Sequence, residues 1–362
     1  MKKIFTFSGD YNPEEQSPIF EAFDQYQSPN WYYRYIYTPR EINLSITDRL
    51  KQLEDNEVDL FRTDRSVVDL IDHKKLIDLS DFVSESDIYK QMLEVCVRGR
   101  KMVCVPDNID ALVLFANKKL TEKLGIDMPN TWNELKESLR TVKKKNPALI
   151  PFAIHNLKDF KGWWPYYLLK PFFVQAGLNF SKVDADNFFD QKPVIESIEY
   201  LGSLIKEGLL SVLDESKYKS RSELAFAAEK AVFIFQGPWA LSTIEYLNPR
   251  LVDNIDFSVL KNKEKVALVG GRFFAVPASA ANPKAAKLFL KSFFADEGYY
   301  SRLINLNKIP GVSTKMKLPS PSGKIKKLIE SYGVVEPLLQ NDIEHQEKIG
   351  DEIGRRLQKY LT

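Results

Sequence analysis

Cysteine and histidine are scarce in this chain of 362 residues, which contains two cysteines and three histidines. The histidines, His73, His155 and His345, lie far apart, and none stands at the spacing of metal ligands. The sequence therefore predicts no metal site. No stretch approaches the roughly 18 to 20 apolar residues of a transmembrane helix either, so no membrane span is expected.

The two cysteines flank a predicted hairpin. Cys96 and Cys104 stand on either side of VRGRKMV, whose turn is expected at Gly99 and Arg100. A two-residue loop there pairs Cys96 with Val103 and leaves the cysteines staggered. We therefore expect two free, mostly buried thiols, with a disulfide as the alternative.

Excess charge of one sign is also missing, because the formal net charge is only +2. That balance does not favour a nucleic-acid binder or a membrane-surface protein. The N-terminal stretch MKKIFTFSGDYN has an apolar run too short for a signal peptide. We expect either a cytoplasmic protein or a chain from which a signal was removed, and the sequence leaves both open.

Aromatic residues, by contrast, are abundant. They make up 12% of the chain, within a composition of 44% hydrophobic and 28% charged residues that is typical of soluble globular proteins. Most aromatic rings are expected in the core, but carbohydrate sites also use them, because C–H groups of a sugar ring pack on an aromatic face. The length predicts two domains.

Short apolar strands alternate with amphipathic helices along most of the chain, which is typical of α/β proteins. Strands are predicted at 3–7, 58–61, 101–106, 110–117, 231–235 and 273–277, and helices at about 13–27, 64–76, 131–145, 193–207, 239–245, 283–298 and 341–360. Thr131 and Glu134 form a capping box, and Asn282 is an N-cap before Pro283. No flexible linker separates the predicted domains, which favours several short crossovers and a hinge.

Candidate ligand-binding residues follow the ends of these strands, where open α/β sheets bind ligands. The candidate segments are Ser8–Tyr11, Arg62–Arg65, Gln236–Trp239, and Gly270–Arg272 before the strand at 273–277. Carboxylates and arginines can hydrogen-bond vicinal hydroxyls in pairs, while a ring covers the apolar sugar face. As a catalytic set these residues are incomplete, so we predict no catalytic residues and no enzyme.

Four segments, in the same order, resemble the signature of extracellular solute-binding proteins of family 1, the maltose-binding type. They are VDLFRTDRSVVDLIDHKKLIDL (58–79), KMVCVPDNIDALVLFANKKLTEKLGIDMPNTWNEL (101–135), FAAEKAVFIFQGPWALSTIE (226–245) and GGRFFAVPASAANPKAAKLFLKSFFADEG (270–298). The resemblance runs nearly end to end. Cys104 departs from the usual Tyr-Gly side of the YGVP strand, and Tyr11 stands where the maltose branch has a basic residue. The family is therefore implied, but maltose specificity is not.

The resemblance implies a periplasmic-binding-protein-like α/β fold of class II, with two lobes joined by hinge crossovers and the ligand cleft between them. We expect an N-terminal lobe at 1–108 plus 257–306 and a C-terminal lobe at 109–256 plus 307–362. The hinges are expected near 107–111, 255–260 and 305–312.

The resemblance also implies ligand contacts at particular positions, each of which has an ordinary structural alternative. On the first lobe it implies contacts at Asp10, which follows the first strand, and at Asp64 and Arg65, while Tyr11 and Arg272 are candidates because they lie beside strand ends. Asp64 and Arg65 could instead be an N-cap and its solvated neighbour. Arg272 could be a plain surface charge.

Three further contacts fall on the hinge and the second lobe. Asp110 is implied as an acidic contact at the first hinge, or alternatively as a brace of that hinge. Of Trp163 and Trp164, one is expected to pack in the core and the other to face the ligand. Trp239 follows a Gly-Pro turn and is expected to stack on a sugar ring, with a hydrophobic-staple role as the alternative.

The expected function is to bind a carbohydrate, either a monosaccharide or an oligosaccharide, to close on it and to deliver it to the membrane subunits of an ABC importer. We expect an extracytoplasmic, periplasmic or lipid-anchored monomer without cofactors. One alternative is a cytoplasmic sugar-sensing domain of a regulator. Another is a thiaminase-like transferase on the same fold, although its nucleophile is expected near Asp110 while Cys104 lies within a strand.

Overall fold

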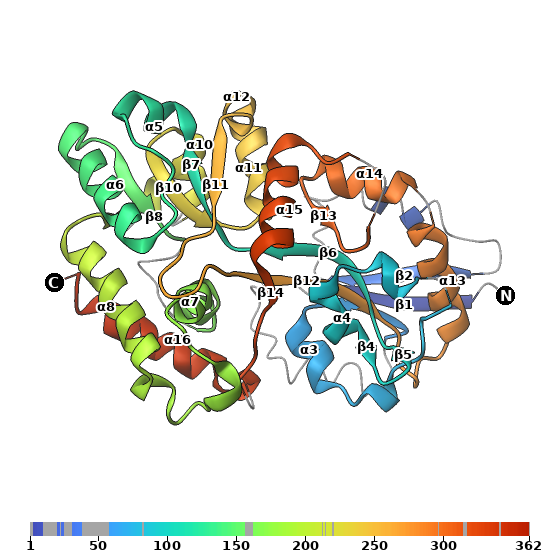
Figure 1. The fold of residues 1–362 in the computed structure, drawn as a ribbon. Helices are drawn as coiled ribbons and strands as arrows, with labels where there is room; N and C mark the ends of the chain where they lie inside the picture. Colours follow the sequence, from blue (N-terminus) through green and yellow to red (C-terminus); the bar gives the residue numbers. More distant parts are fainter. Residues whose placement is uncertain are drawn as a thin grey trace. The chain divides into compact units, whose positions relative to one another are not determined.

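The computed structural model of the chain describes residues 3–9, 20–21, 23–24, 31–37, 58–81, 83–155, 162–211, 213, 215–218, 221–295, 297–313, 317–339 and 342–361. Backbone contacts divide the chain into two compact α/β units (Figure 1). Unit 1 comprises Met1–Ile109 and Gly270–Leu318, and unit 2 comprises Asp110–Val269 and Pro319–Thr362. The mixed α/β class agrees with the sequence analysis.

The chain passes from one unit to the other three times, after residues 109, 269 and 318. The first crossing lies inside the predicted 107–111. The other two come later than the predicted 255–260 and 305–312, because strands hold the chain in its unit for longer. β11 (Ile255–Ser258) pairs with β7 (Val113–Asn117) of unit 2, and β13 (Ile309–Pro310) pairs with β6 (Val105–Ala111). Hinge motion at these crossings stays a prediction.

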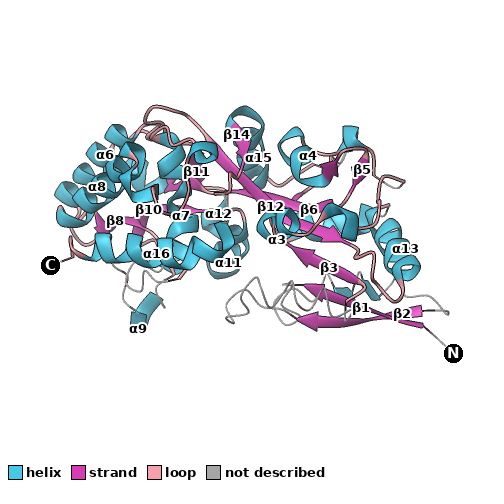
Figure 2. Cartoon of the chain, turned by 90° about the horizontal axis from the view of Figure 1, so that it is seen from below, coloured by secondary structure: helices cyan, strands magenta, loops and turns pink. Residues whose placement is uncertain are grey.

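Unit 1 is built on a mixed sheet with the strand order β13-β6-β12-β3-β1-β2. Its further strands are β1 (Lys3–Gly9), β2 (Trp31–Tyr37), β3 (Leu60–Thr63) and β12 (Ala267–Ala275), and its helices are α3 (Arg65–Leu70), α4 (Lys90–Cys96), α13 (Pro283–Phe294) and α14 (Glu297–Asn305). β1, β2 and β3 run parallel and lie side by side in Figure 2. Short 3-10 turns occupy His73–Lys75 and Glu85–Asp87. Residues 20–21 and 23–24 of the predicted helix at 13–27 are helical, and the rest of that range lies outside the described residues.

Two strand predictions in unit 1 were displaced. β3 begins and ends two residues later than predicted, so Arg62 and Thr63 lie in the strand instead of after it. β12 begins at Ala267, so the segment Gly270–Arg272 also lies inside a strand. A Cβ added at Gly271 would collide with the backbone oxygen of Asn108 in β6. Glycine there is a requirement of close strand packing, not the sign of a loop.

The hairpin predicted around the cysteines is confirmed. Val97 in β4 (Val97–Arg98) pairs with Met102 in β5 (Lys101–Met102), and the Val103 amide donates to the Cys96 carbonyl at 2.8 Å. Both cysteines are free and buried, as expected.

Unit 2 is built on a second mixed sheet, with the strand order β11-β7-β10-β8-β9. Its other strands are β8 (Ile150–Ala153), β9 (Leu210–Ser211) and β10 (Ala231–Gln236), and β14 (Gly333–Val335) pairs with the first residues of β12. The helices are α5 (Lys118–Leu124), α6 (Trp132–Lys145), α7 (Trp164–Gln175), α8 (Lys192–Lys206), α9 (Glu215–Tyr218), α10 (Ser222–Ala227), α11 (Trp239–Leu247), α12 (Pro249–Val252), α15 (Ser320–Tyr332) and α16 (Asp342–Gln358). β10 runs parallel to β8 and antiparallel to β7.

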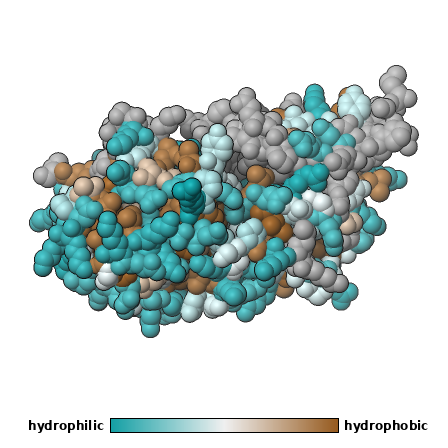
Figure 3. Space-filling model, turned by 90° about the horizontal axis from the view of Figure 1, so that it is seen from above, coloured by the Kyte–Doolittle hydropathy of each residue, from teal (hydrophilic) through white to brown (hydrophobic). Residues whose placement is uncertain are grey.

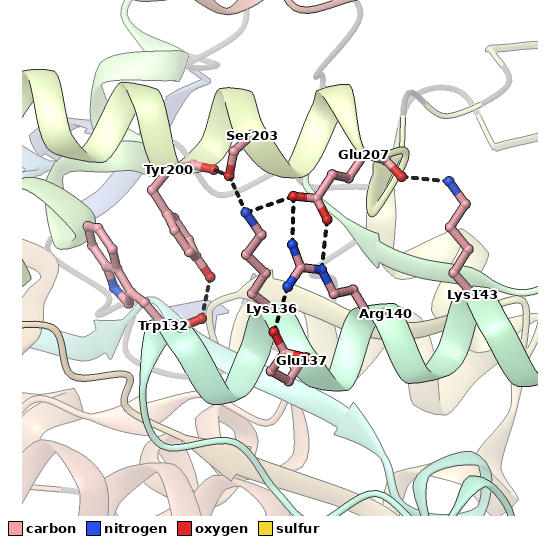
Figure 4. A network of polar contacts seen from close by, with 8 residues as sticks. All are labelled: Trp132, Lys136, Glu137, Arg140, Lys143, Tyr200, Ser203 and Glu207. Atoms are coloured by element: carbon pink, nitrogen blue, oxygen red, sulfur yellow. Dashed lines mark hydrogen bonds and ion pairs between the residues drawn. The ribbon is translucent and has the colours of Figure 1, made fainter.

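Helices α6 and α8 are joined by a surface network of charged and aromatic groups (Figure 4). The N-cap bond of the predicted capping box is confirmed, because the Glu134 amide donates to Thr131 Oγ1 at 3.1 Å, while the Glu134 carboxylate accepts from the Asn130 amide at 2.7 Å. Glu207, just after α8, accepts from Arg140 Nε at 2.8 Å and pairs with Lys136 at 2.8 Å. The Arg140 and Lys136 interactions hold the pKa of Glu207 at about 2. This network braces the two helices.

Helix α7 runs through the core of unit 2. Its side chains Leu168, Leu169, Phe172 and Phe173 are fully buried, and even Lys170 is only 2% exposed. α16 packs beside α7, as Figures 1 and 2 both show. α7 is therefore a rigid support for the tryptophans at its start.

None of the described helices combines the length and the apolarity that crossing a membrane requires. Hydrophilic side chains cover most of the coloured surface on the face drawn in Figure 3, with hydrophobic ones in small groups between them.

Candidate functional site

The candidate site lies in unit 2, where two parallel strands end beside each other. Phe233 of β10 pairs with Phe152 of β8, so the carboxyl ends of both strands reach the same edge of the sheet. His155 follows β8, and Gln236 is the last residue of β10. Loops at such an edge are where open α/β sheets bind ligands.

Three aromatic residues gather at the start of α7. The rings of Trp163 and Trp164 meet edge to face with centroids 4.9 Å apart, and Trp164 stacks on Tyr167 at 5.5 Å. All three residues are half-buried. Trp164 packs against the core of unit 2, as the sequence analysis expected of one member of the pair.

The turn before these tryptophans is tied to α16. Gly162 has φ of +66° and donates its amide proton to Asp351 Oδ1 at 2.7 Å. Gly350 approaches the carbonyl of Gly162 so closely that no side chain fits between them. These contacts fix where α7 begins, and with it the position of the Trp163–Trp164 pair.

Trp239 stands at the start of α11, on the Gly-Pro turn that ends β10. The residue is half-buried, and its indole N–H donates to Gln236 Oε1 at 3.1 Å. A Cβ added at Gly237 would collide with the Trp239 ring, so the glycine makes room for the indole. The indole also packs against the core of unit 2, but Trp239 is the first residue of α11 and so does not occupy either position of a hydrophobic staple. Exposure of its other face to a ligand stays a prediction.

A buried polar group connects Trp239 with the pair at α7. Gln236 Nε2 donates to Ser222 Oγ at 3.0 Å and to Glu223 Oε2 at 3.2 Å. His155 Nδ1 lies 3.6 Å from the same Glu223 oxygen, and its ring meets the Trp164 ring edge to face at 5.5 Å. Contacts therefore run without interruption from Trp239 to Trp164.

Glu223 is the centre of this polar group. It is 4% exposed, and Arg221 Nε donates to its Oε1 at 2.7 Å. Burial raises the pKa of Glu223, but the interactions with His155 and Arg221 outweigh burial and hold the pKa below its usual value. Glu223 is therefore a charged carboxylate at neutral pH.

The sequence analysis missed Glu223 and His155 as site residues. His155 was considered only as a metal ligand, and Glu223 stands in an ordinary helical segment. The available signal was the polar Gln236, which directly precedes the Gly-Pro-Trp turn and is 2% exposed. A buried amide needs partners, and those partners are the missing residues.

In unit 1, the charged candidates next to β3 are held by neighbouring side chains. Asp64 occupies the N-cap position of α3 without a side-chain capping bond. Arg65 Nε donates to Asp69 at 2.7 Å, and its Nη2 pairs with Glu94 at 3.0 Å. These contacts favour a structural role for Arg65, although ligand contact by Asp64 and Arg65 stays a prediction.

A buried ion pair of unit 1 was not anticipated. Arg62, 5% exposed, donates through Nε to Asp107 Oδ2 at 2.8 Å and through Nη2 to Asn108 Oδ1 at 2.8 Å. The hydroxyl of Tyr299 also donates to Asp107. The pair joins β3 to β6 inside the unit.

The remaining residues predicted to contact the ligand lie in strands or outside the described residues. Asp110 is buried in β6 and is the first residue of unit 2. Arg272 is half-buried in β12, where its Nη1 donates to the Gly271 carbonyl at 3.3 Å. Asp10 and Tyr11 lie outside the described residues.

Chemically, the unit 2 site offers aromatic faces next to one buried carboxylate. Among the described residues, no group of three or more His, Cys, Asp or Glu side chains could hold a metal ion. The arrangement suits an uncharged ligand with an apolar face and hydroxyl groups.

Comparison with protein families identifies the family to which the chain belongs. Residues 51–300 match the model of the bacterial extracellular solute-binding protein family. The chain belongs to this family. The resemblance noted from its four sequence segments is thereby confirmed.

Two curated relatives of this chain are named as sugar-binding proteins. The multiple sugar-binding protein of Streptococcus mutans is 26% identical over 208 residues, which is 53% of this chain and 47% of the relative. The melibiose/raffinose/stachyose-binding protein MelE of Bacillus subtilis is 22% identical over 226 residues, 61% of this chain and 53% of the relative. The matches thus span about half the length of each curated relative.

Solved structures share the fold over nearly the whole length of this chain. The GacH receptor of Streptomyces glaucescens, studied unliganded and with acarbose, has a TM-score of 0.80 at 21% identity, covering 99% of this chain and 94% of that one. Maltose-bound MalE3 of T. maritima has a TM-score of 0.75 at 18% identity, covering 99% and 95%. The periplasmic-binding-protein-like fold of class II is confirmed.

Proposed function

We propose that the chain binds a carbohydrate and delivers it to an ABC importer. The observation that carries this proposal is the gathering of Trp163, Trp164 and Trp239 at one edge of the unit 2 sheet, in a member of a solute-binding family. Rings on rigid helix starts suit the flat, apolar faces of sugars. Their positions are set by contacts within the unit, so little ordering remains to oppose binding.

An oligosaccharide is the proposed ligand class. Two tryptophans at the start of α7 and one at the start of α11 offer more aromatic surface than a single sugar ring covers. The named ligands of the relatives, melibiose, raffinose and stachyose, and the acarbose and maltose of the solved structures support this choice.

Binding without catalysis is proposed as the activity. A transferase on this fold needs a reactive nucleophile, and Cys104 is the candidate that the sequence offers. Cys104 is fully buried, and burial raises the pKa of its thiol well above the usual value. A protonated, inaccessible thiol supports a binding role.

Contacts from residues outside the tryptophan site are also proposed. Asp64, Arg65 and Arg272 of unit 1 and Asp110 of unit 2 carry groups that can hydrogen-bond sugar hydroxyls. Asp10 is proposed as a contact from the family resemblance, and Tyr11 from its place after the first strand. We further propose a monomer that works outside the cytoplasm, because the family is described as extracellular, and that docks on the importer's membrane subunits.

Isothermal titration calorimetry of the native chain tests the proposal directly. The panel comprises glucose, maltose, melibiose, raffinose, stachyose and maltotetraose, with a neutral peptide and a polyol as non-sugar ligands. We expect saturable heat with the oligosaccharides and weaker binding of glucose. Binding of the peptide or the polyol alone would contradict a carbohydrate function.

A further inference from the structure

Glu223 contacts two separate parts of the unit 2 site. Its Oε2 lies 3.2 Å from Gln236 Nε2 and 3.6 Å from His155 Nδ1. Arg221 holds the other oxygen at 2.7 Å. One buried carboxylate thus faces both the residue that bonds Trp239 and the residue that touches Trp164.

The carboxylate sets the direction of the Gln236 amide. A charged carboxylate only accepts hydrogen bonds, so Gln236 must present its NH₂ group to Glu223. The carbonyl end of the amide then points the other way, where it accepts the indole N–H of Trp239 at 3.1 Å. Reversing the amide would place two donors against each other at Trp239.

The same carboxylate acts on the imidazole of His155. His155 Nδ1 lies 3.6 Å from Glu223 Oε2, within ion-pair distance but beyond a hydrogen bond, so the carboxylate attracts the Nδ1 edge of the ring electrostatically. The imidazole then meets the Trp164 ring at an interplanar angle of 74°. The orientation of Trp164 is therefore supported by the same charge as that of Trp239.

We propose that Glu223 is a positioning residue that orients both Trp239, through Gln236, and Trp164, through His155. This inference rests on the proposed function in one respect, that Trp239 and Trp163 contact the sugar, with Trp164 supporting Trp163 through their edge-to-face contact. It assigns Glu223 no contact with the ligand.

Replacing the charge while keeping the shape tests the inference. Glu223→Gln allows the Gln236 amide to reverse and frees the imidazole. Near-ultraviolet circular dichroism of the sugar-free protein should change in the tryptophan bands, and sugar affinity should fall about tenfold, the effect of one charge-assisted hydrogen bond. Glu223→Asp keeps the charge and should restore part of both signals.

Two controls separate positioning from general damage. Glu229→Gln, whose carboxylate accepts from Asn248 Nδ2 at 3.2 Å, should leave the tryptophan bands and the affinity unchanged. Gln236→Met removes the branch to Trp239, together with the bonds to Ser222 and Glu223, and leaves the His155 branch in place. It should therefore lose the part of the spectrum that Trp239→Phe also loses and keep the part that Trp164→Phe removes.

A double-mutant cycle gives the decisive readout. If Glu223 acts through Trp239, Glu223→Gln should weaken binding much less in a Trp239→Phe background than in the native protein. Additive losses together with unchanged tryptophan bands would overturn the inference. If the native protein binds no sugar, the proposed function fails, and the spectra of the sugar-free variants still decide whether Glu223 positions the tryptophans.

Discussion

Unit 1 and unit 2 hold their candidate ligand-binding residues in different ways. In unit 2 the predicted tryptophans lie on helix starts and are joined by buried, mostly uncharged hydrogen-bonding groups around Glu223. In unit 1 one of the two predicted arginines, Arg65, is held by the carboxylates of Asp69 and Glu94. The buried Arg62 of unit 1 instead donates to Asp107 and so joins β3 to β6 within the sheet.

The difference shows which kind of residue is informative in a sequence of this type. An arginine beside a short helix finds acidic partners on that helix or its neighbour, so its presence says little about ligands. A tryptophan on a Gly-Pro turn occupies space that only a ligand or the core can cover. Four predictions, from the largest expected effect to the smallest, test this contrast.

The ion pair of unit 1 should matter most for stability. Asp107→Asn leaves the buried guanidinium of Arg62 without its counter-charge, and breaking a buried pair costs about 3–5 kcal/mol. Urea unfolding of the native chain and the variant measures the loss. Asp69→Asn removes a carboxylate that is 21% exposed and should cost far less. Equal losses in the two variants would remove the distinction between buried and surface pairs.

The two adjacent tryptophans of unit 2 should separate stability from binding. Trp164→Ala removes a ring packed on the core and should lower the free energy of unfolding by about 2 kcal/mol, less than a fully buried ring would. Trp163→Ala should leave stability nearly unchanged and weaken sugar binding. Urea unfolding and calorimetry on both variants provide the comparison, and reversed effects would show that Trp163 is the packed member.

The close approach of Trp239 to Gly237 should be sensitive to a single methyl group. Gly237→Ala forces the indole to move, which should cost about 1–2 kcal/mol of stability and also weaken sugar binding. Gly202→Ala makes a similar collision with the ring of Tyr360, away from the tryptophans. It should lower stability without changing affinity. An affinity loss in the Gly202 variant alone would argue against a site at Trp239.

The smallest effect should come from the surface network of α6 and α8. Bonded to Arg140, Glu207 has a folded-state pKa of about 2, below its ordinary 4.5. Its stabilising contribution is therefore complete above pH 4.5 and is lost as the pH falls toward 2. Because Glu207 is a third exposed, the contribution is small.

Urea midpoints of the native chain and Glu207→Gln, measured between about pH 6 and 3, should differ slightly at the upper end and converge at the lower one. A difference that grows as the pH falls would contradict the lowered pKa. Added salt should shrink the difference at every pH, because this pair lies at the surface.

Much of the local structure was predictable because it follows short-range rules. The capping box at Thr131 and Glu134, the hairpin between the cysteines and the helix that starts at Trp239 each depend on a few neighbouring residues. β12 was misjudged because Gly270 and Gly271 suggest a turn. In the structure the backbone oxygen of Asn108 lies so close to Gly271 that no side chain fits there. Asn108 is more than 150 residues away in sequence, so local sequence patterns do not reveal this contact.

The site was predictable only in part, for the same reason. Trp239 and the Trp163–Trp164 pair could be selected individually because a large ring on a turn is unusual. Their connection through His155, Glu223 and Gln236 joins three separate segments that meet only when β8 and β10 pair. Nothing in the spacing of these residues indicates that pairing.

The most direct test of the account compares Trp239→Ala and Trp239→Phe with the native chain, titrated by calorimetry with the sugar that the native chain binds best. The account predicts that the alanine variant loses at least about thirtyfold in affinity, as expected for a tryptophan at the centre of an interface, while the phenylalanine variant keeps a measurable part. Native affinity in the alanine variant, with its fold intact, would contradict the claim that the tryptophans of unit 2 carry the ligand.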